Sequence, residues 1–512
     1  MAEDKTTMKK TLSLTGVTVN AMALIAPGAF LWITYQIQAS NTGGDTDMWT
    51  GIVAALIVAF LTAVAFSEMA RRYPEAGAGG SYYFAEKAFL DREKTSHQRF
   101  ARIAKFLTGW AAHLFYWVYP GVMVAMMATL ITYIFSQFNV NLPIPVQIGI
   151  AIMFSIFVGF IAVRGISGST NIAIIINIIQ LVSLVGFSIL AIMFRVQNPL
   201  HATQWLHPSA GSVIFPHSLG AMLFQSTIAI LILVGFESST SLAGEAINPK
   251  RDIPRGVLLS LLIQGLFAYL LEYFAANYAI SEKLVYVAAD GTKLTGIAAA
   301  AASGAPIGDL TRLIGDSMLG GNGFALMIII AITVGLAVLG TTLAAMNTAV
   351  RVSFAMAQDK EMPGLLGALH EKHATPHKGV WMLVAVSAII GSVGVLNVTA
   401  LTGVTLASNI GTFVLYALIC GLTFVTFLGR CEVHSVKHAV IPIIGFIGNI
   451  GLLVGVVLIG LTTPGVSANA TKMALWITGG WGVVSAVYLV LNSRKHGRYI
   501  IPPVGALNKK PF

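Results

Sequence analysis

Apolar runs of membrane-spanning length recur along the whole chain, and this recurrence constrains its fold more than any other feature. Of the 512 residues, 56% are hydrophobic and only 10% are charged, whereas about a quarter of a typical soluble protein is charged. A helix needs about 20 apolar residues to cross a bilayer, and it satisfies its own backbone there. We therefore predict an all-α polytopic membrane protein with twelve transmembrane helices. The predicted spans lie near 12–38, 50–70, 102–138, 145–163, 169–194, 217–247, 254–280, 323–356, 378–397, 399–428, 438–461 and 471–491.

Lysine and arginine concentrate in alternate predicted loops. If both termini are cytoplasmic, the cytoplasmic regions hold 26 of the 31 basic residues and the outer loops hold 5. This asymmetry is typical of membrane insertion, and it predicts a multi-pass protein of the cell (inner) membrane with both termini in the cytoplasm. The same rule explains the net charge of +10. We therefore exclude nucleic acid as a partner and expect the lipid bilayer and a small-molecule substrate instead.

Two of the predicted spans are interrupted near their centres. The first contains Ala26-Pro27-Gly28, and the sixth contains Gly235-Phe236-Glu237-Ser238. Pro and Gly weaken a helix, and the freed backbone groups need protein or a water-filled cavity around them. A kink at Pro27 alone is a common feature of membrane helices. A matched pair of breaks in two halves of a chain, however, indicates a transporter binding site.

The two breaks lie five spans apart, which fits two inverted five-helix repeats. The predicted organisation is a cytoplasmic N-terminus 1–11, a first repeat 12–194, a second repeat 217–428, two further spans in 438–491, and a cytoplasmic tail 492–512. The substrate pocket is then expected where the two interrupted helices meet.

Glu237 places a carboxylate where hydrocarbon should continue. Such a group costs roughly 3 kcal/mol at mid-membrane on insertion scales, so it persists when it faces a cavity, binds a cation or carries a proton. We interpret Glu237 as a substrate, proton or gating residue; the alternative is a carboxyl hydrogen-bonded to a neighbouring helix. Glu272, in the seventh span, either has a similar role or pairs near the interface. His113, in the third span, is expected to be a satisfied interior side chain.

Three stretches resemble motifs of the amino acid–polyamine–organocation superfamily. They are "FSEMARRYPEAGAGGSYYFA" at 66–85, "GEAINPKRDIPRGV" at 244–257 and "NTAVRVSFAMAQDKEMPGLLGALHEKHATPHKGV" at 347–380. Each follows a predicted span on the cytoplasmic side, where Gly and Pro turn the chain. Glu68 and Arg72 lie one helical turn apart, so they are expected to form an inner-gate or surface ion pair.

The resemblance implies a LeuT-type fold and alternating access, with the substrate held between the interrupted helices. It assigns substrate contacts to both breaks and, more weakly, to two hydroxyls. These residues are Ala26, Pro27, Gly28, Ala29, Gly235, Phe236, Glu237, Ser238, Thr341 and Thr405. Half-helix ends bind charged substrate groups in such sites.

Two departures from the family pattern bear on coupling. Pro27 has no backbone N–H, so one donor for a substrate carboxylate is missing. Where many family members carry Lys in the fifth span, this chain has Gln180, which cannot titrate. The resemblance therefore favours substrate exchange, or coupling through Glu237, over proton symport through position 180.

The function predicted is secondary active transport of amino acids or related amines and polyamines by alternating access, with substrate exchange and coupling through Glu237 as the two modes left open. The alternative is a nutrient sensor or channel built on a transporter fold. An enzyme is disfavoured because neither HExxH nor GxSxG is present. No metal-ligand spacing occurs around the two cysteines, so no cofactor is expected. The sequence carries no signal for an oligomeric state.

Overall fold

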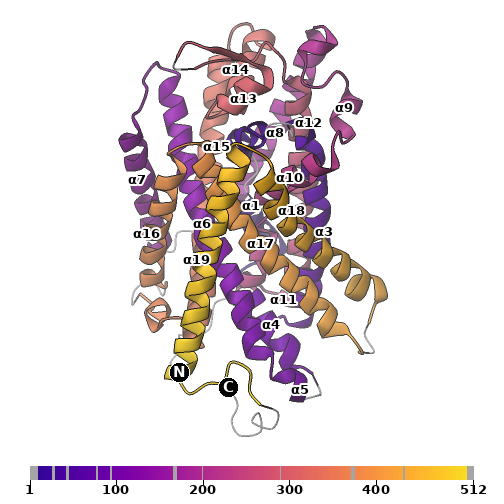
Figure 1. Ribbon diagram of the computed structural model, residues 1–512, viewed down its shortest axis with the longest axis vertical. Helices are drawn as coiled ribbons and strands as arrows, with labels where there is room; N and C mark the ends of the chain where they lie inside the picture. The colour runs from indigo at the N-terminus through magenta and orange to yellow at the C-terminus, as the bar shows by residue number, and fades with distance from the viewer. Residues whose placement is uncertain are drawn as a thin grey trace.

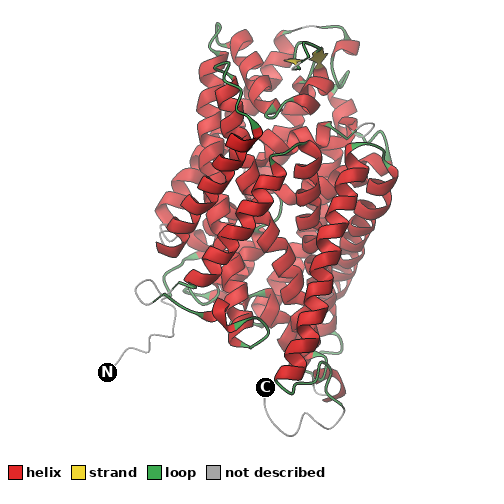
Figure 2. Cartoon of the chain, turned by 60° about the vertical axis from the view of Figure 1, so that its left-hand side comes forward, coloured by secondary structure: helices red, strands yellow, loops and turns green. Residues whose placement is uncertain are grey.

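The protein is an elongated bundle of long helices (Figure 1). The computed structural model describes residues 10–25, 29–41, 45–76, 79–92, 95–164, 170–198, 200–288, 290–370, 375–430 and 433–503. Helix accounts for nearly all of the regular structure drawn in Figure 2. We call the end that carries α5 (Thr95–Gln98) the α5 end, and the opposite end, which carries α14 (Pro306–Met318), the α14 end.

Within the described residues, eleven helices are long and apolar enough to cross a membrane. They coincide with the second to twelfth predicted spans. Their main elements are α3 (Met48–Arg72), α6 (Ala101–Ser136), α7 (Ile144–Arg164), α8 (Thr170–Gln197), α10 (Leu219–Ala229) with η5 (Ile230–Ile232) and η6 (Phe236–Leu242), α11 (Pro249–Leu261) with η7 (Leu262–Tyr269) and α12 (Leu270–Ala279), α15 (Gly323–Gln358), α16 (His377–Gly394), α17 (Val398–Phe427), η9 (Val436–Val440) with α18 (Ile441–Thr462), and α19 (Val466–Lys495).

The first predicted span is covered by two shorter helices. These are α1 (Leu14–Ile25) and α2 (Ala29–Ala39), on either side of residues 26–28, which lie outside the described residues. The count of twelve spans and the inverted repeat therefore stay predictions.

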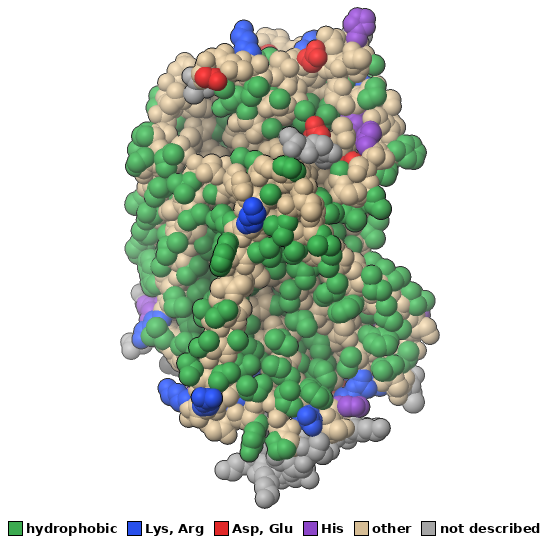
Figure 3. All heavy atoms as spheres, in the orientation of Figure 1, with side chains coloured by type: hydrophobic (Ala, Val, Ile, Leu, Met, Phe, Trp, Pro, Cys, Tyr) green, Lys and Arg blue, Asp and Glu red, His purple; other side chains and the backbone are tan. Residues whose placement is uncertain are grey.

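The core lies around α6 and α17, which pack against each other near the centre of the bundle. Both are buried along most of their length. Peripheral helices instead expose large apolar side chains, such as Phe157 on α7, Ile447 on α18 and Val483 on α19. In Figure 3 hydrophobic side chains cover much of the middle of the visible face, and charged side chains lie mostly toward its two ends. A contiguous apolar belt of this kind is the surface that a bilayer covers.

A small cap covers the α14 end. The strands β1 (Val285–Val287) and β2 (Lys293–Thr295) form an antiparallel hairpin, followed by α13 (Gly296–Ala302) and α14. Pro306 begins α14, where its missing N–H costs no helical bond. Gly308 of α14 lies directly against Trp32 of α2, which docks the cap on the bundle. Short elements η1 (Asp45–Asp47), η4 (Ala202–Gln204) and α9 (Ala210–Ile214) complete this end.

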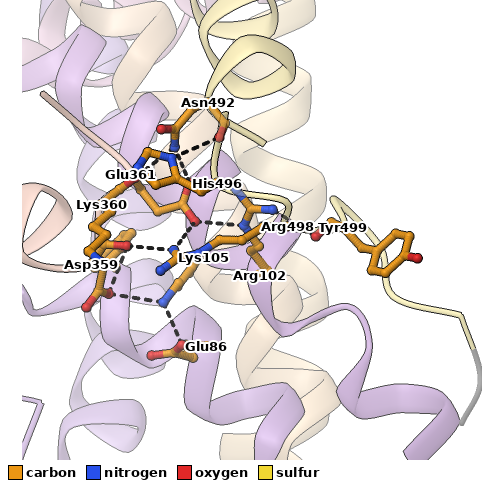
Figure 4. Close-up of polar contacts among 11 residues, drawn as sticks. Glu86, Arg102, Lys105, Asp359, Lys360, Glu361, Asn492, His496, Arg498 and Tyr499 are labelled. Carbon is orange, nitrogen blue, oxygen red and sulfur yellow. Dashed lines mark hydrogen bonds and ion pairs between the residues drawn. The ribbon is translucent and has the colours of Figure 1, made fainter. Parts of the chain in front are cut away.

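A network of ion pairs ties helices together at the α5 end (Figure 4). The Arg102 guanidinium on α6 donates to both carboxylate oxygens of Glu361, at 2.7 and 3.2 Å. Lys105, one turn along α6, contacts Glu86 at 2.6 Å and Asp359 at 3.0 Å. Glu86 belongs to α4 (Ser81–Leu90), and the other two acids follow α15, before η8 (Gly364–Gly367). The network thus joins α4 and α6 to the loop after α15.

Candidate functional site

The sixth span is not a continuous α-helix. It changes to 3₁₀ geometry after Ala229, and Gly235 then adopts a φ of +129°, which favours glycine. In η6 four hydroxyl side chains donate to carbonyls three residues earlier. The bonds run from Ser238 to Gly235 (2.6 Å), Ser239 to Phe236 (2.7 Å), Thr240 to Glu237 (2.7 Å) and Ser241 to Ser238 (2.7 Å). These hydroxyls pair backbone groups that an interrupted helix would leave unsatisfied in an apolar interior.

Gly235 also lies directly against the end of α1. A Cβ atom at this position would be 2.8 Å from the Ile25 nitrogen and 2.9 Å from the Leu24 carbonyl carbon. Both are backbone atoms, so they cannot move aside as a flexible side chain would. The close approach therefore requires glycine and brings α1 and η6 into contact.

The end of α1 is held by side chains from neighbouring elements. The last four carbonyls of a helix have no partner within it, and here each of them accepts a side-chain hydrogen bond. The bonds are Gln264 Nε2 to Met22 O (2.9 Å), Thr341 Oγ1 to Ala23 O (3.1 Å), Tyr119 OH to Leu24 O (3.1 Å) and Tyr269 OH to Ile25 O (2.9 Å). All four donors are neutral.

The π-helical geometry of η7 explains how two of these donors reach α1 together. Gln264 and Tyr269 are five residues apart in η7. In an α-helix such a pair would point about 140° apart around the axis. In a π-helix the hydrogen bonds run from i to i+5, which brings residues five apart much closer to the same face.

Glu237 is the charged group at the break, and it is only 2% exposed. The Tyr116 hydroxyl donates to its Oε1 at 2.9 Å, while the Tyr416 hydroxyl and the Gly235 N–H donate to Oε2 at 2.7 and 2.9 Å. No Lys or Arg of the described part of the chain forms an ion pair with it. A buried carboxylate is costly without an opposite charge. Three neutral donors therefore orient Glu237 but leave its charge open to a proton or to a cationic ligand group.

Phe236 belongs to a buried aromatic cluster beside Glu237. Its ring centroid lies 5.3 Å from that of Tyr416 and 6.0 Å from that of Phe66, and those two rings are 5.8 Å apart. The two contacts of Phe66 are edge-to-face, and the contact between Phe236 and Tyr416 is tilted; such packing fixes ring positions. The cluster therefore holds the Tyr416 phenol in place over the Glu237 carboxylate.

A cavity of about 430 Å³ lies beside η6. Its polar lining includes Ser238 and Ser241 of η6, Asn20 of α1, Gln180 of α8 and Asn347 of α15. The Gln180 side chain is 5% exposed, and its Oε1 atom has no hydrogen-bond partner within the described residues. This amide is therefore available to a ligand in the cavity.

An ion pair borders the same cavity toward the α5 end. The Arg351 guanidinium of α15 lies 2.6 Å from the Glu245 carboxylate, and both residues line the cavity. Glu245 follows η6, and its carbonyl accepts from the N–H groups of Thr11 and Leu12 just before α1. Glu245 therefore connects the residues before α1, the residues after η6 and α15 at this border of the cavity.

The predicted site residues fall into several groups. Gly235, Phe236 and Glu237 form the break itself, and Ser238 and Gln180 line the cavity. Thr341 bonds α1. Thr405 is buried without a hydroxyl partner in the described chain, and its eleven-residue separation from Tyr416 on α17 corresponds to about 16 Å along the axis. Ala26, Pro27 and Gly28 lie outside the described residues, and Ala29 begins α2.

The predicted ion pair between Glu68 and Arg72 is wrong, because each residue contacts a different partner. Glu68 lies 3.5 Å from Arg71 and 3.3 Å from the His438 ring, while Arg72 pairs with Asp91 at 2.9 Å. Arg72 is the last residue of α3, so its side chain reaches across to the end of α4 instead of back along its own helix.

Two other titratable side chains lie within the predicted spans, His113 and Glu272. The His113 ring contacts the Gly109 carbonyl at 3.2 Å and the Ser353 hydroxyl at 2.9 Å, which confirms a satisfied interior histidine. Glu272 is 2% exposed, and its Oε2 has no partner in the described chain. It is therefore enclosed by the protein and does not lie on its surface. No group of three or more His, Cys, Asp or Glu side chains in the described residues could hold a metal ion.

Sequence reasoning missed both phenols that hold Glu237. Neither Tyr116 nor Tyr416 is among the site residues predicted from the sequence. Tyr116 lies on a tyrosine-rich stretch of the third span, which is the one signal that pointed to it. Nothing local distinguishes Tyr416, because its role arises only when α17 packs beside η6.

Eleven apolar helices, a helix break and a buried acid near an internal cavity define an integral membrane protein of the transporter class. Comparison with known proteins agrees: the amino acid permease family model matches residues 10–484. The chain therefore belongs to the amino acid permease family, and it is a transporter, not an enzyme.

Relatives of known name share modest identity with this chain. A methylthioribose transporter of Bacillus subtilis is 21% identical over 96% of this chain and 94% of its own length. A branched-chain amino acid permease of the same organism is 25% identical, over 58% of this chain and 56% of the relative. A low-affinity putrescine importer of Escherichia coli is 23% identical, over 53% and 54%. The chain thus matches nearly all of the first relative and about half of each of the other two.

Proposed function

We propose that this protein is a secondary active transporter that exchanges amino acids or related amines and polyamines across the membrane by alternating access. The observation that carries the proposal is the Glu237 carboxylate, which is buried, oriented by three neutral donors and without an ion-pair partner in the described chain. An ammonium group is common to amino acids, amines and polyamines. Such a group supplies the missing positive charge.

The proposed pocket lies between the two breaks, within two inverted repeats, 12–194 and 217–428, of a LeuT-type fold. Its contacts are Ala26, Pro27, Gly28, Ala29, Gly235, Phe236, Glu237 and Ser238. The contact between α1 and Gly235 supports this placement, since it brings the two interrupted spans together. Discontinuous helices near the midplane are where secondary transporters bind substrate.

Release toward the α5 end is proposed to pass through the 430 Å³ cavity. Gln180 lines this route and contributes an amide without titrating. The Glu245–Arg351 pair stands at its border and acts as a gate, a role that the sequence had assigned to Glu68 and Arg72. Opening needs this pair to separate while α1 and η6 move.

Transport by purified protein in liposomes tests the proposal. Labelled arginine, putrescine, a branched-chain amino acid and methylthioribose are offered to vesicles with and without unlabelled substrate inside. Exchange predicts that uptake depends on the internal substrate. Unsaturable downhill flux would indicate a channel, and binding without flux would indicate a sensor.

Glu237→Gln provides the test of the site. We expect it to abolish exchange of ammonium-bearing substrates while the protein remains folded, because the amide cannot pair with a cation. Glu282→Gln, an exposed acid at the α14 end, is the matched control and should exchange normally. Exchange at the parent rate by Glu237→Gln would remove this carboxylate from the mechanism.

A further inference from the structure

A second pocket, of about 710 Å³, lies at the α5 end between the end of α3 and the start of α11. Among the described residues, four basic side chains line it, and no carboxylate does. They are Arg71, Lys250, Arg251 and Arg255. All four are exposed. The pocket therefore presents concentrated positive charge at the surface, apart from the cavity beside η6.

Within the described residues, two of these four basic side chains pair with an acid. Arg71 lies 3.5 Å from Glu68, and Arg251 lies 2.8 Å from Asp252. Lys250 and Arg255 form no ion pair within the described residues. Helix α11 also begins here, with Pro249 in its first turn, so the positive end of its dipole adds to the field. The site is built for an anion.

The surface next to the pocket is apolar. Arg251, Arg255, Leu262 and Leu266 follow one another at spacings of four, seven and four residues, which places them along one stripe of α11 and η7. Leu262 is 37% exposed and Leu266 is 43% exposed. The stripe thus changes from basic at its start to apolar farther along the same candidate span, Pro249–Ala279.

We propose that this pocket binds the phosphate headgroup of an anionic phospholipid, with an acyl chain lying along Leu262 and Leu266. The pocket is at the end of a span, which is the depth of lipid headgroups. Basic pockets at such positions recognise anionic lipid headgroups, and guanidinium groups donate to phosphate in a forked geometry. Inorganic phosphate would satisfy the charge but would make no use of the apolar stripe.

Native mass spectrometry of the purified protein in detergent tests this assignment. The protein is titrated with phosphatidylglycerol and, separately, with phosphatidylcholine. We expect specific phosphatidylglycerol adducts that weaken about 30-fold in Lys250→Gln/Arg255→Gln, since two basic contacts at a membrane surface are lost. Lys378→Gln/Lys437→Gln removes the same charge from exposed positions outside the pocket and should bind as the parent does.

Three outcomes would overturn the proposal. Equal weakening in the control double variant would show general surface attraction. Equal binding of phosphatidylcholine would show binding by the apolar belt alone. Displacement of the lipid by millimolar inorganic phosphate, together with unchanged lipid binding in Leu262→Asn/Leu266→Asn, would assign the pocket to a soluble anion. Thermal unfolding of each variant confirms that it is folded before binding is compared.

Discussion

Glu237 and Glu361 are equally buried, at 2% and 1% exposure, yet their surroundings differ in kind. Glu361 receives a two-pronged contact from Arg102, and Arg498 lies 3.7 Å away. Among the described residues, Glu237 receives hydrogen bonds only from two phenols and one backbone N–H. The Glu361 carboxylate has a counter-charge in Arg102, and this ion pair joins α6 to the loop after α15. The Glu237 carboxylate has no Lys or Arg partner within the described residues, and this is why we propose that it changes partners during transport.

The largest effect we expect comes from breaking the compensated pair. Arg102→Gln leaves Glu361 buried without its main counter-charge, which should destabilise the protein by about 3–5 kcal/mol. The measurement is thermal unfolding in detergent. The apolar pair Arg102→Met/Glu361→Leu should recover much of the loss. If Arg102→Gln unfolds like the parent, the contrast between the two acids disappears.

At Glu237 we expect a loss of transport instead of a loss of fold. Tyr416→Phe removes one hydrogen bond to a charged group, worth about 1.5–3 kcal/mol, so exchange should slow by about 10- to 150-fold. Initial exchange rates in liposomes measure this. Tyr488→Phe, on the peripheral helix α19, should exchange at the parent rate. Equal rates in both variants would contradict the role given to the Tyr416 phenol.

The backbone at the break offers a smaller test. Gly235→Ala introduces a Cβ at a φ of +129° and against α1, with an expected cost of about 1–3 kcal/mol. Gly451→Ala, in α18 with open space around it, should be neutral or slightly stabilising. Unfolding midpoints of the two variants are compared directly. Similar midpoints would mean that α1 and η6 are not in close contact.

An exposed ion pair should give the smallest effect. Asp91 contacts Arg72 and Arg430, and its carboxylate is 40% exposed. Partial burial opposes ionisation, but the two guanidinium groups outweigh it and lower the Asp91 pKa. Because the pKa is lower in the folded state, the ionised carboxyl stabilises the fold at pH values above its unfolded-state pKa. This stabilisation is lost as the pH falls through the folded-state pKa. Asp91→Asn should therefore cost less than about 1 kcal/mol near neutral pH.

The pH dependence of unfolding checks this sign. The difference between parent and Asp91→Asn should shrink as pH falls below about 4, where the unfolded carboxyl becomes protonated. A difference that grows on acidification would contradict the direction of the shift. It would also show that exposed and buried pairs at the α5 end do not follow the same electrostatics.

The sequence predicted the spans well because lipid imposes a length and an apolar composition on each helix. It also located Gly235 and Glu237, since both break the rules that a membrane helix otherwise obeys. Partners that meet only in the folded bundle could not be found this way. Arg102 and Glu361, for example, are 259 residues apart in the sequence. Arg72 pairs with Asp91 and not with Glu68, because Arg72 is the last residue of α3. The hairpin formed by β1 and β2 was also missed, although Asp290-Gly291 between the strands is a turn signal.

The four hydrogen bonds at the end of α1 have a mechanical consequence. Their donors come from α6, η7 and α15, so three separate elements grip one helix terminus. If any of these elements moves away, at least one carbonyl of α1 loses its hydrogen bond. An unsatisfied acceptor in the protein interior costs about 1–3 kcal/mol. A displacement of α6, η7 or α15 therefore affects the other two elements through their shared hydrogen bonds to the end of α1. Movement of one of these elements alone is disfavoured.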